Sequence, residues 1–197
     1  MTNQRRPQRR SPFKQPWMLL AGLAATLALA MGVFLTAAHM EENDSFCASC
    51  HSEPESTYFQ RTQTERVDLA SAHHAESVRC IDCHSGPGVT GRMSALLLGA
   101  TDLAKFVTGQ AQQPAPLLQP IPDANCIKCH GEVAQARNFN EHFHAFLSKW
   151  QAMDASAGTC VSCHSAHTTD GSVAIGFLEK ERTLTVCQHC HTVAGEG

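Results

Sequence analysis

The pattern Cys-x-x-Cys-His occurs five times in this chain of 197 residues, and it limits the possible folds more than any other feature. The five copies begin at Cys47, Cys80, Cys126, Cys160 and Cys187. This pattern is the attachment signature of c-type haem. Its two thiols form thioethers to the haem, and the histidine that follows ligates the iron as the proximal ligand. The sequence therefore predicts five covalently bound c-type haems.

These motifs use all ten cysteines of the chain, which leaves none for a disulfide or another metal site. A Cys-x-x-Cys pair could also be half of a zinc site or a redox pair, but neither requires a histidine directly after each pair. Five copies of the full signature therefore favour haem. The predicted haem-binding cysteines are Cys47, Cys50, Cys80, Cys83, Cys126, Cys129, Cys160, Cys163, Cys187 and Cys190, and the predicted proximal ligands are His51, His84, His130, His164 and His191.

The chain is short for the number of haems that it is predicted to carry. About 160 residues follow its apolar N-terminal segment, which is roughly 32 residues for each haem and too few for a large separate core. We therefore expect a mainly α-helical fold with long loops and little or no sheet. It would comprise one N-terminal transmembrane helix and a compact domain organised around a haem stack. The net charge of -3 gives no sign of nucleic-acid binding.

Residues 17–38 contain no charged side chain, and a helix of about 20 apolar residues can cross a bilayer. By the positive-inside rule, residues 1–16 form a cytoplasmic basic tail. The haem domain, residues 39–197, then lies on the periplasmic or extracytoplasmic side of the cell membrane. The alternative is a cleaved signal peptide, but its apolar region would span only about 7–15 residues, so a retained single-pass anchor is favoured. The cations before the segment are Arg5, Arg6, Arg9, Arg10 and Lys14.

Proline and glycine divide the haem domain. Residues 110–122 are rich in Gln and Pro and predict an extended linker. It separates residues 39–109, with haems 1 and 2, from residues 123–197, with haems 3, 4 and 5. Residues 89–109 have the periodicity of an amphipathic helix. That helix either packs on haem or lies on the membrane as part of a quinol pocket, and both interpretations fit the pattern.

Seven histidines lie outside the proximal positions, and five haems need up to five further axial ligands. We expect His189 to point away from its own iron because it stands between two haem-binding cysteines. His39, at the membrane boundary, could ligate haem 1, accept a quinol proton or lie on the surface. Bis-His ligation saturates iron and favours electron transfer over substrate activation. The candidate distal ligands are His73, His74, His142, His144 and His167.

From the anchor through the fourth motif, roughly residues 17–167, the chain resembles the NapC/NirT/NrfH family of membrane-anchored quinol dehydrogenase cytochromes. The matching features are the single anchor, segment 46–51, segment 71–73 before the second motif, segment 104–109, and segment 159–164 with His167 close behind. The resemblance implies that menaquinol or ubiquinol is oxidised near haem 1 and that a redox partner protein accepts the electrons. It also implies a quinol pocket with a lysine and an acidic residue, whose counterparts here are Lys105 and Asp102.

Two features depart from the family pattern: family members commonly have four haems, and Glu53 stands where some carry a methionine ligand. His39, Glu41 and Glu42 complete the set of candidate quinol-site residues because quinol oxidation releases protons near haem 1.

Two other functions remain open. The chain could be a passive relay subunit of a larger respiratory complex, or a multihaem nitrite or hydroxylamine oxidoreductase, which needs an open iron. A small anchor and a haem-rich surface also suit an oligomer or a stable complex.

Overall fold

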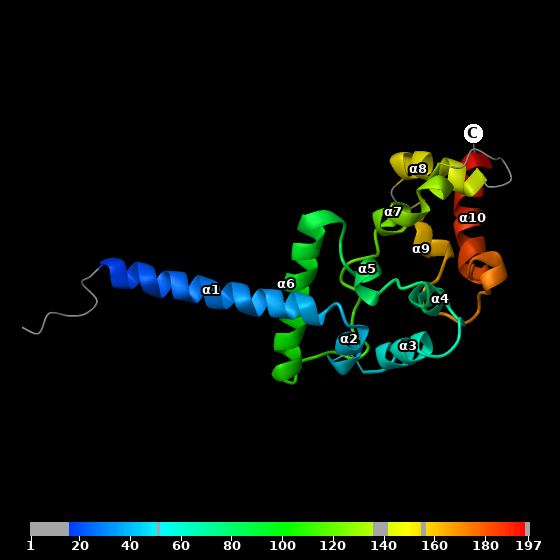
Figure 1. The fold of residues 1–197 in the computed structure, drawn as a ribbon. Coiled ribbons are helices and arrows are strands. Elements are labelled where there is room, and N and C mark those ends of the chain that lie inside the picture. The colour runs from blue at the N-terminus through cyan, green and yellow to red at the C-terminus, as the bar shows by residue number, and fades with distance from the viewer. Residues whose placement is uncertain (1–15, 51, 136–141, 155–156, 196–197) are drawn as a thin grey trace, which may run out of the picture. The chain divides into compact units, whose positions relative to one another are not determined.

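The structure is a computed structural model that describes residues 16–50, 52–135, 142–154 and 157–195 (Figure 1). Within these ranges the chain forms helices and loops and no strand, and an isolated antiparallel bridge joins His164 and Leu178. Two compact units are present, Met1–Met40 and Glu41–Gly197. The predicted mainly helical fold with little or no sheet is confirmed.

The first unit contains helix α1, Pro16–Met40, which is long and apolar enough to cross a membrane. None of its residues is buried within the protein. A helix that is apolar on all sides and buries none of them suits lipid hydrocarbon as its surroundings. The predicted N-terminal transmembrane helix over residues 17–38 corresponds to α1. The basic tail lies almost entirely outside the described residues.

The second unit carries the haem motifs on short helices joined by loops (Figure 1). The longest helix is α6, which corresponds to the amphipathic helix expected over residues 89–109. The helices of this unit are α2 Asp44–Cys50, α3 Glu55–Thr62, α4 Leu69–Ala75, α5 Cys80–His84, α6 Gly88–Val107, α7 Asp123–Ala134, α8 His142–Met153, α9 Cys160–Cys163, the 3-10 turn η3 Val173–Ile175 and α10 Lys180–Gly195.

Helix α6 has a sequence-determined start and end. Pro87 precedes its first residue and cannot donate a helical hydrogen bond, so it suits a helix start. At the other end Gly109 adopts a left-handed φ of 69°, and the N–H of Gln110 donates to the carbonyl of Lys105 at 2.7 Å. This is the Schellman arrangement, for which glycine is favoured because it has no Cβ.

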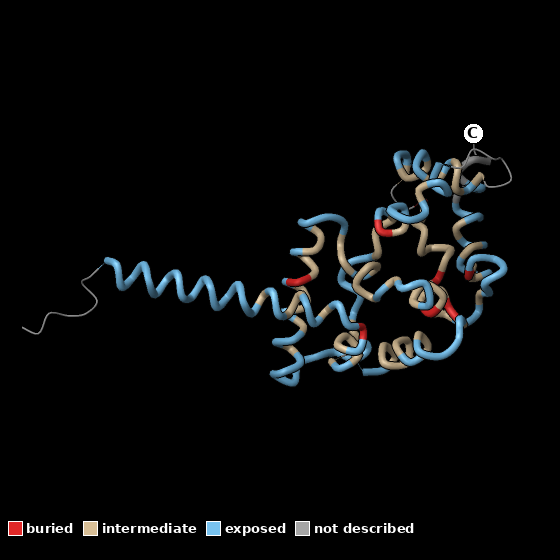
Figure 2. Tube along the Cα trace, in the orientation of Figure 1, coloured by how far each residue is buried: buried red, intermediate tan, exposed pale blue. Residues whose placement is uncertain are grey.

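The protein part of the second unit has very little apolar core. Leu96, Ala157 and Phe177 are the buried hydrophobic residues among those described, and most of the tube in Figure 2 is exposed or intermediate. Large apolar side chains such as Leu97 and Val107 are instead exposed on α6. A domain of this size normally buries a continuous apolar core. The sparse core therefore fits the expectation that the chain is too short for a large separate core and is organised around a haem stack.

Candidate haem centres

Every haem motif lies on or at the end of a helix: α2, α5, α7, α9 and α10 carry the five copies. Residues three apart on a helix lie on the same side of it, so both cysteines of a motif are directed toward one edge of a ligand. This is the arrangement that two thioether bonds to a single haem require. His51 and the side chain of Cys190 lie outside the described part of the structure.

Two aspartates hold consecutive motifs together in the same way. Asp44, three residues before Cys47, accepts a hydrogen bond through Oδ1 from the backbone N–H of Cys80 at 3.0 Å. Asp123, three residues before Cys126, accepts through Oδ1 from the backbone N–H of Cys160 at 2.8 Å. Each carboxylate therefore satisfies an N–H at the start of the next motif's helix. Sequence reasoning missed both residues, although the shared Asp-x-x-Cys spacing was a visible signal.

Motif 2 contacts motif 3, and motif 4 contacts motif 5. Asn125, next to Cys126, donates through Nδ2 to the carbonyls of Cys83 at 2.8 Å and Ser85 at 2.6 Å. Helix α9 packs on α10, where Arg182 donates to the hydroxyl of Ser165 at 3.3 Å. Together with the two aspartate contacts, these bonds place the five motifs next to one another in chain order.

Four proximal histidines are each paired with one of the candidate distal histidines. Imidazole nitrogens bind transition metals at about 2 Å, and the ring centroid lies roughly 1 Å behind the nitrogen. Two imidazoles on opposite sides of one iron therefore have centroids about 6 Å apart. The observed pairs match this spacing: His84–His167 at 6.1 Å, His73–His130 at 5.9 Å, His144–His164 at 6.1 Å and His142–His191 at 6.3 Å.

Backbone carbonyls fix the tautomer of two of these rings. Nδ1 of His73 lies 2.9 Å from the carbonyl oxygen of Leu69, and Nδ1 of His164 lies 2.6 Å from that of Gly176. A carbonyl oxygen can only accept, so Nδ1 carries the proton in both rings. The lone pair of Nε2 is then available to a metal, as in most histidine–metal sites. The residues present therefore fit a haem iron at these positions.

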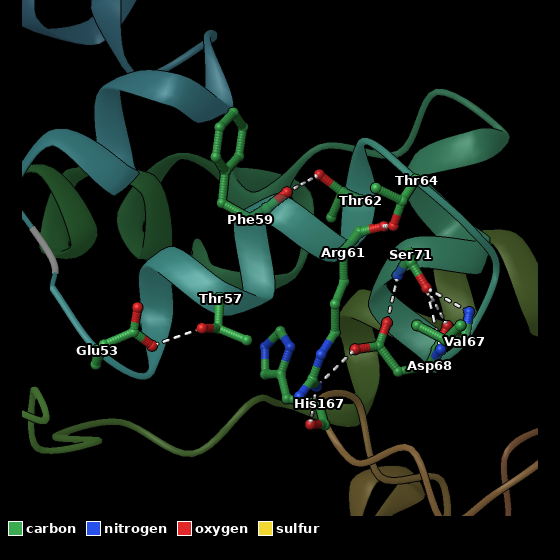
Figure 3. Close-up of polar contacts among 10 residues, drawn as sticks. All are labelled: Glu53, Thr57, Phe59, Arg61, Thr62, Thr64, Val67, Asp68, Ser71 and His167. Carbon is green, nitrogen blue, oxygen red and sulfur yellow. Dashed lines mark hydrogen bonds and ion pairs between the residues drawn. The ribbon is translucent and has the colours of Figure 1, made fainter.

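His167 is held by residues of the first half of the chain (Figure 3). Its ring stacks on Tyr58, with centroids 4.2 Å apart and planes 7° apart. Arg61 donates to the carbonyl of His167 at 3.0 Å and also contacts the buried carboxylate of Asp68 at 3.3 Å. Burial, with the neighbouring His84 adding to it, lowers the pKa of His167 to about 4. The ring is therefore neutral at pH 7, which is the form that binds iron.

The remaining histidines have other surroundings. Nε2 of His74 lies 3.3 Å from the carboxylate of Asp44. His51 lies outside the described residues, so the histidine that pairs with it in motif 1 is not described. His189 lies 3.0 Å from the carboxylate of Asp154. His39 is in the last turn of α1, in the other unit.

Several motif cysteines lie in surroundings that raise the pKa of a thiol. A reactive thiol has a lowered pKa. Here burial is the main cause that raises the pKa of Cys47, Cys83, Cys126 and Cys160, and it raises the pKa of Cys80 to about 12. In addition, no group of three or more His, Cys, Asp or Glu side chains gathers as a metal site among the residues that the structure describes.

The candidate quinol residues of the second unit fall into two groups, one on α6 and one in the segment before α2. Lys105 donates through Nζ to the carboxylate of Asp102 at 3.0 Å, and both side chains are half-exposed in the last turns of the helix. Glu41 instead pairs with Arg92 at 2.8 Å, and both of these side chains are largely covered. Glu42 is exposed. Sequence reasoning missed Arg92, which offered no signal beyond its place on the polar side of the helix.

A cavity of about 540 Å³ lies between motif 1 and the end of α6. Its lining includes Cys50, Phe106, Gly109 and Gln113. Its position beside Cys50 suits the haem of motif 1, and Phe106 adjoins Lys105 in sequence. The first haem position and the Lys105–Asp102 pair therefore belong to the same end of α6.

Comparison with known families agrees with these observations. The N-terminal region of the NapC/NirT cytochrome c family matches residues 9–119, which is more than half of the chain. A doubled CXXCH motif matches residues 153–196, which contain motifs 4 and 5. No curated protein and no solved structure matches the chain.

Proposed function

The chain belongs to the NapC/NirT cytochrome c family, and from that membership we propose that it is a pentahaem cytochrome that takes electrons from membrane quinol. It passes them to an acceptor protein outside the cytoplasm. Membrane-anchored electron transfer by a multihaem c-type cytochrome is the role that the family match and the haem motifs support directly. The number of haems, the quinol and the acceptor are the proposed part.

We assign the axial ligands of four haems from the histidine pairs. Bound c-type haem supplies one-electron chemistry at its iron. The motif histidines His84, His130, His164 and His191 act as proximal ligands. Their distal partners are His167, His73, His144 and His142, in that order. His51 is the proximal ligand of haem 1, and His74 is the remaining candidate for its distal side.

The observation that carries this function is the pairing of four proximal histidines with four distal ones. Two imidazoles fill both axial positions of an iron, so these positions do not bind a substrate. A nitrite or hydroxylamine oxidoreductase needs an open position, which this ligand set leaves to haem 1 at most. The contacts between consecutive motifs support a continuous path from motif 1 to motif 5.

The proposed site of quinol oxidation lies beside motif 1, at the end of α6. Quinol oxidation releases protons, so ionisable groups must lie near the site of oxidation. Lys105 and Asp102 are paired close to the cavity that Cys50 and Phe106 line. Exposed apolar side chains on α6, such as Leu97, Leu103 and Val107, suit a lipid-soluble substrate. Glu41, Glu42 and His39 are further proton-accepting candidates.

The test is reduction of the purified, detergent-solubilised holoprotein by a menaquinol analogue, followed in the visible haem bands. We expect rapid reduction of most haems and its loss when a quinol-site inhibitor is added. Dithionite reduction of the same sample is the control for intact haems. Reduction by dithionite but not by quinol would overturn the quinol proposal and favour the passive relay subunit. Turnover of nitrite or hydroxylamine by the purified protein would instead favour the oxidoreductase.

A further inference from the structure

We propose that the chain sets two alternating electronic classes of haem site through the angle between paired imidazole planes. The planes are nearly parallel in His84–His167, at 18°, and in His144–His164, at 7°. They are crossed in His73–His130, at 80°, and in His142–His191, at 73°. The inference rests on the axial ligation proposed above.

The angle matters because an axial imidazole donates π electrons only perpendicular to its own plane. Low-spin ferric iron has one half-filled dπ orbital. Two parallel rings donate into the same orbital and stabilise the ferric state most strongly. Two crossed rings divide their donation between two orbitals that then have nearly equal energies. Crossed pairs therefore give a more positive reduction potential and a large-gmax electron paramagnetic resonance (EPR) signal, whereas parallel pairs give an ordinary rhombic signal. The identity of the axial ligands and the hydrogen bonds to them are established means of tuning haem.

Local contacts of the protein hold several of these planes. The carbonyl of Gly176 binds Nδ1 of His164 at 2.6 Å, and a Cβ at this left-handed glycine would lie 3.3 Å from Cε1 of that ring. The carbonyl of Leu69, one helical turn earlier on α4, binds Nδ1 of His73 at 2.9 Å. Tyr58 stacks on His167 at 4.2 Å with planes 7° apart. Such outer contacts fix the orientation of a ligand ring.

The two classes alternate in the order of the motifs: motif 2 is parallel, motif 3 crossed, motif 4 parallel and motif 5 crossed. Each of these positions therefore borders one of the other class, because consecutive motifs are in contact. The final position, in motif 5, belongs to the class of higher potential. A more positive terminal position favours the arrival of electrons at the exit toward an acceptor.

The first test is EPR of the fully oxidised holoprotein. We expect two rhombic low-spin signals and two large-gmax low-spin signals besides any signal of the motif 1 site. Four low-spin signals of one class would overturn the inference while leaving the bis-His ligation intact. Predominantly high-spin signals would instead contradict the ligation itself. Quinol reduction, tested separately, bears on neither result.

Two matched variants assign the signals, because His142 and His144 are two residues apart on α8. His142→Gln should remove one large-gmax signal and no rhombic one, and His144→Gln should remove one rhombic signal and no large-gmax one. In each variant a high-spin signal should replace the lost one. The opposite assignment, or loss of the same class in both, would contradict the proposed geometry.

A third variant tests a positioning residue. Tyr58→Leu removes the ring that stacks on His167 and should broaden or shift one rhombic signal, whereas Tyr58→Phe keeps the stack and should restore it. Haem content should be equal in the two variants. Identical EPR spectra of both variants and the unchanged protein would show that Tyr58 does not set this plane.

Discussion

The imidazole ring centroids of His144 and His164 lie 6.1 Å apart with planes only 7° apart, although His144 is on α8 and His164 directly follows α9. His144 is on α8, which also places His142 opposite His191 of the last motif. In the proposed ligation, one helix therefore contributes ligands to two neighbouring haem positions. Because residues two apart on a helix point in nearly opposite directions, α8 can bridge motifs 4 and 5 without competition between its histidines.

Asp123 should be important for stability because its carboxylate joins three elements. It accepts from the N–H of Cys160 and from Nε2 of Gln151 on α8, at 2.8 and 2.7 Å. We expect Asp123→Ala to lower the free energy of unfolding by about 1–2 kcal/mol, as for the loss of a helix cap. Thermal unfolding of the holoprotein, followed by circular dichroism, measures this loss. Asp170→Ala, at an exposed aspartate, is the control and should change it by less than about 0.5 kcal/mol. Equal effects of the two variants would contradict the proposed role.

Lys105 and Asp102 should control electron entry. Lys105→Met and Asp102→Asn should each slow reduction by a menaquinol analogue about 10-fold or more, since positioned proton-transfer groups contribute factors of this size. The dithionite-reduced spectrum should stay unchanged. Arg66→Gln breaks an exposed ion pair of Arg66 with Glu76 and is the matched control, with an unchanged rate expected. If variants at Lys105, Asp102, Glu41, Glu42 and His39 all keep the original rate, the proposed quinol site is wrong.

The sequence predicts much of the candidate site because the chemistry of that site is local. A Cys-x-x-Cys-His motif specifies attachment and proximal ligation within five residues, so its assignment needs no fold. The apolar anchor and the mainly helical class followed from composition and periodicity in the same way. The partners of the histidines could not be predicted, because His84 and His167 are far apart in sequence and meet only through folding.

The ion pair between Glu41 and Arg92 could not be predicted either, because the two residues are far apart in sequence. It leads to a further prediction about stability. It connects the segment before α2 with α6 at 2.8 Å, and Glu41 is only 16% exposed. A Cβ at Gly99 of α6 would lie 3.2 Å from the Glu41 carboxylate, so the approach is close. Glu41→Gln should cost about 1–2 kcal/mol of folding free energy because it leaves Arg92 covered without its partner.

Adding Arg92→Met to Glu41→Gln should cost less than the sum of the two single changes. Chemical unfolding of the four proteins in the cycle measures this coupling. Strictly additive losses would mean that the contact contributes nothing to stability.

His189 should prove dispensable for haem ligation although it lies inside motif 5. Its ring is 3.0 Å from the Asp154 carboxylate and 45% exposed. We expect His189→Gln to keep the haem content and all low-spin signals, whereas His191→Gln, two residues later, should lose one low-spin signal. A low-spin signal lost in His189→Gln would identify this residue as a ligand instead.

Intact mass of the purified protein, combined with the haem absorbance of the same sample, tests most directly whether all five motifs bind haem. We predict a covalent mass increase of five haems on each chain. An increase of four haems or fewer in fully matured protein would contradict the pentahaem assignment.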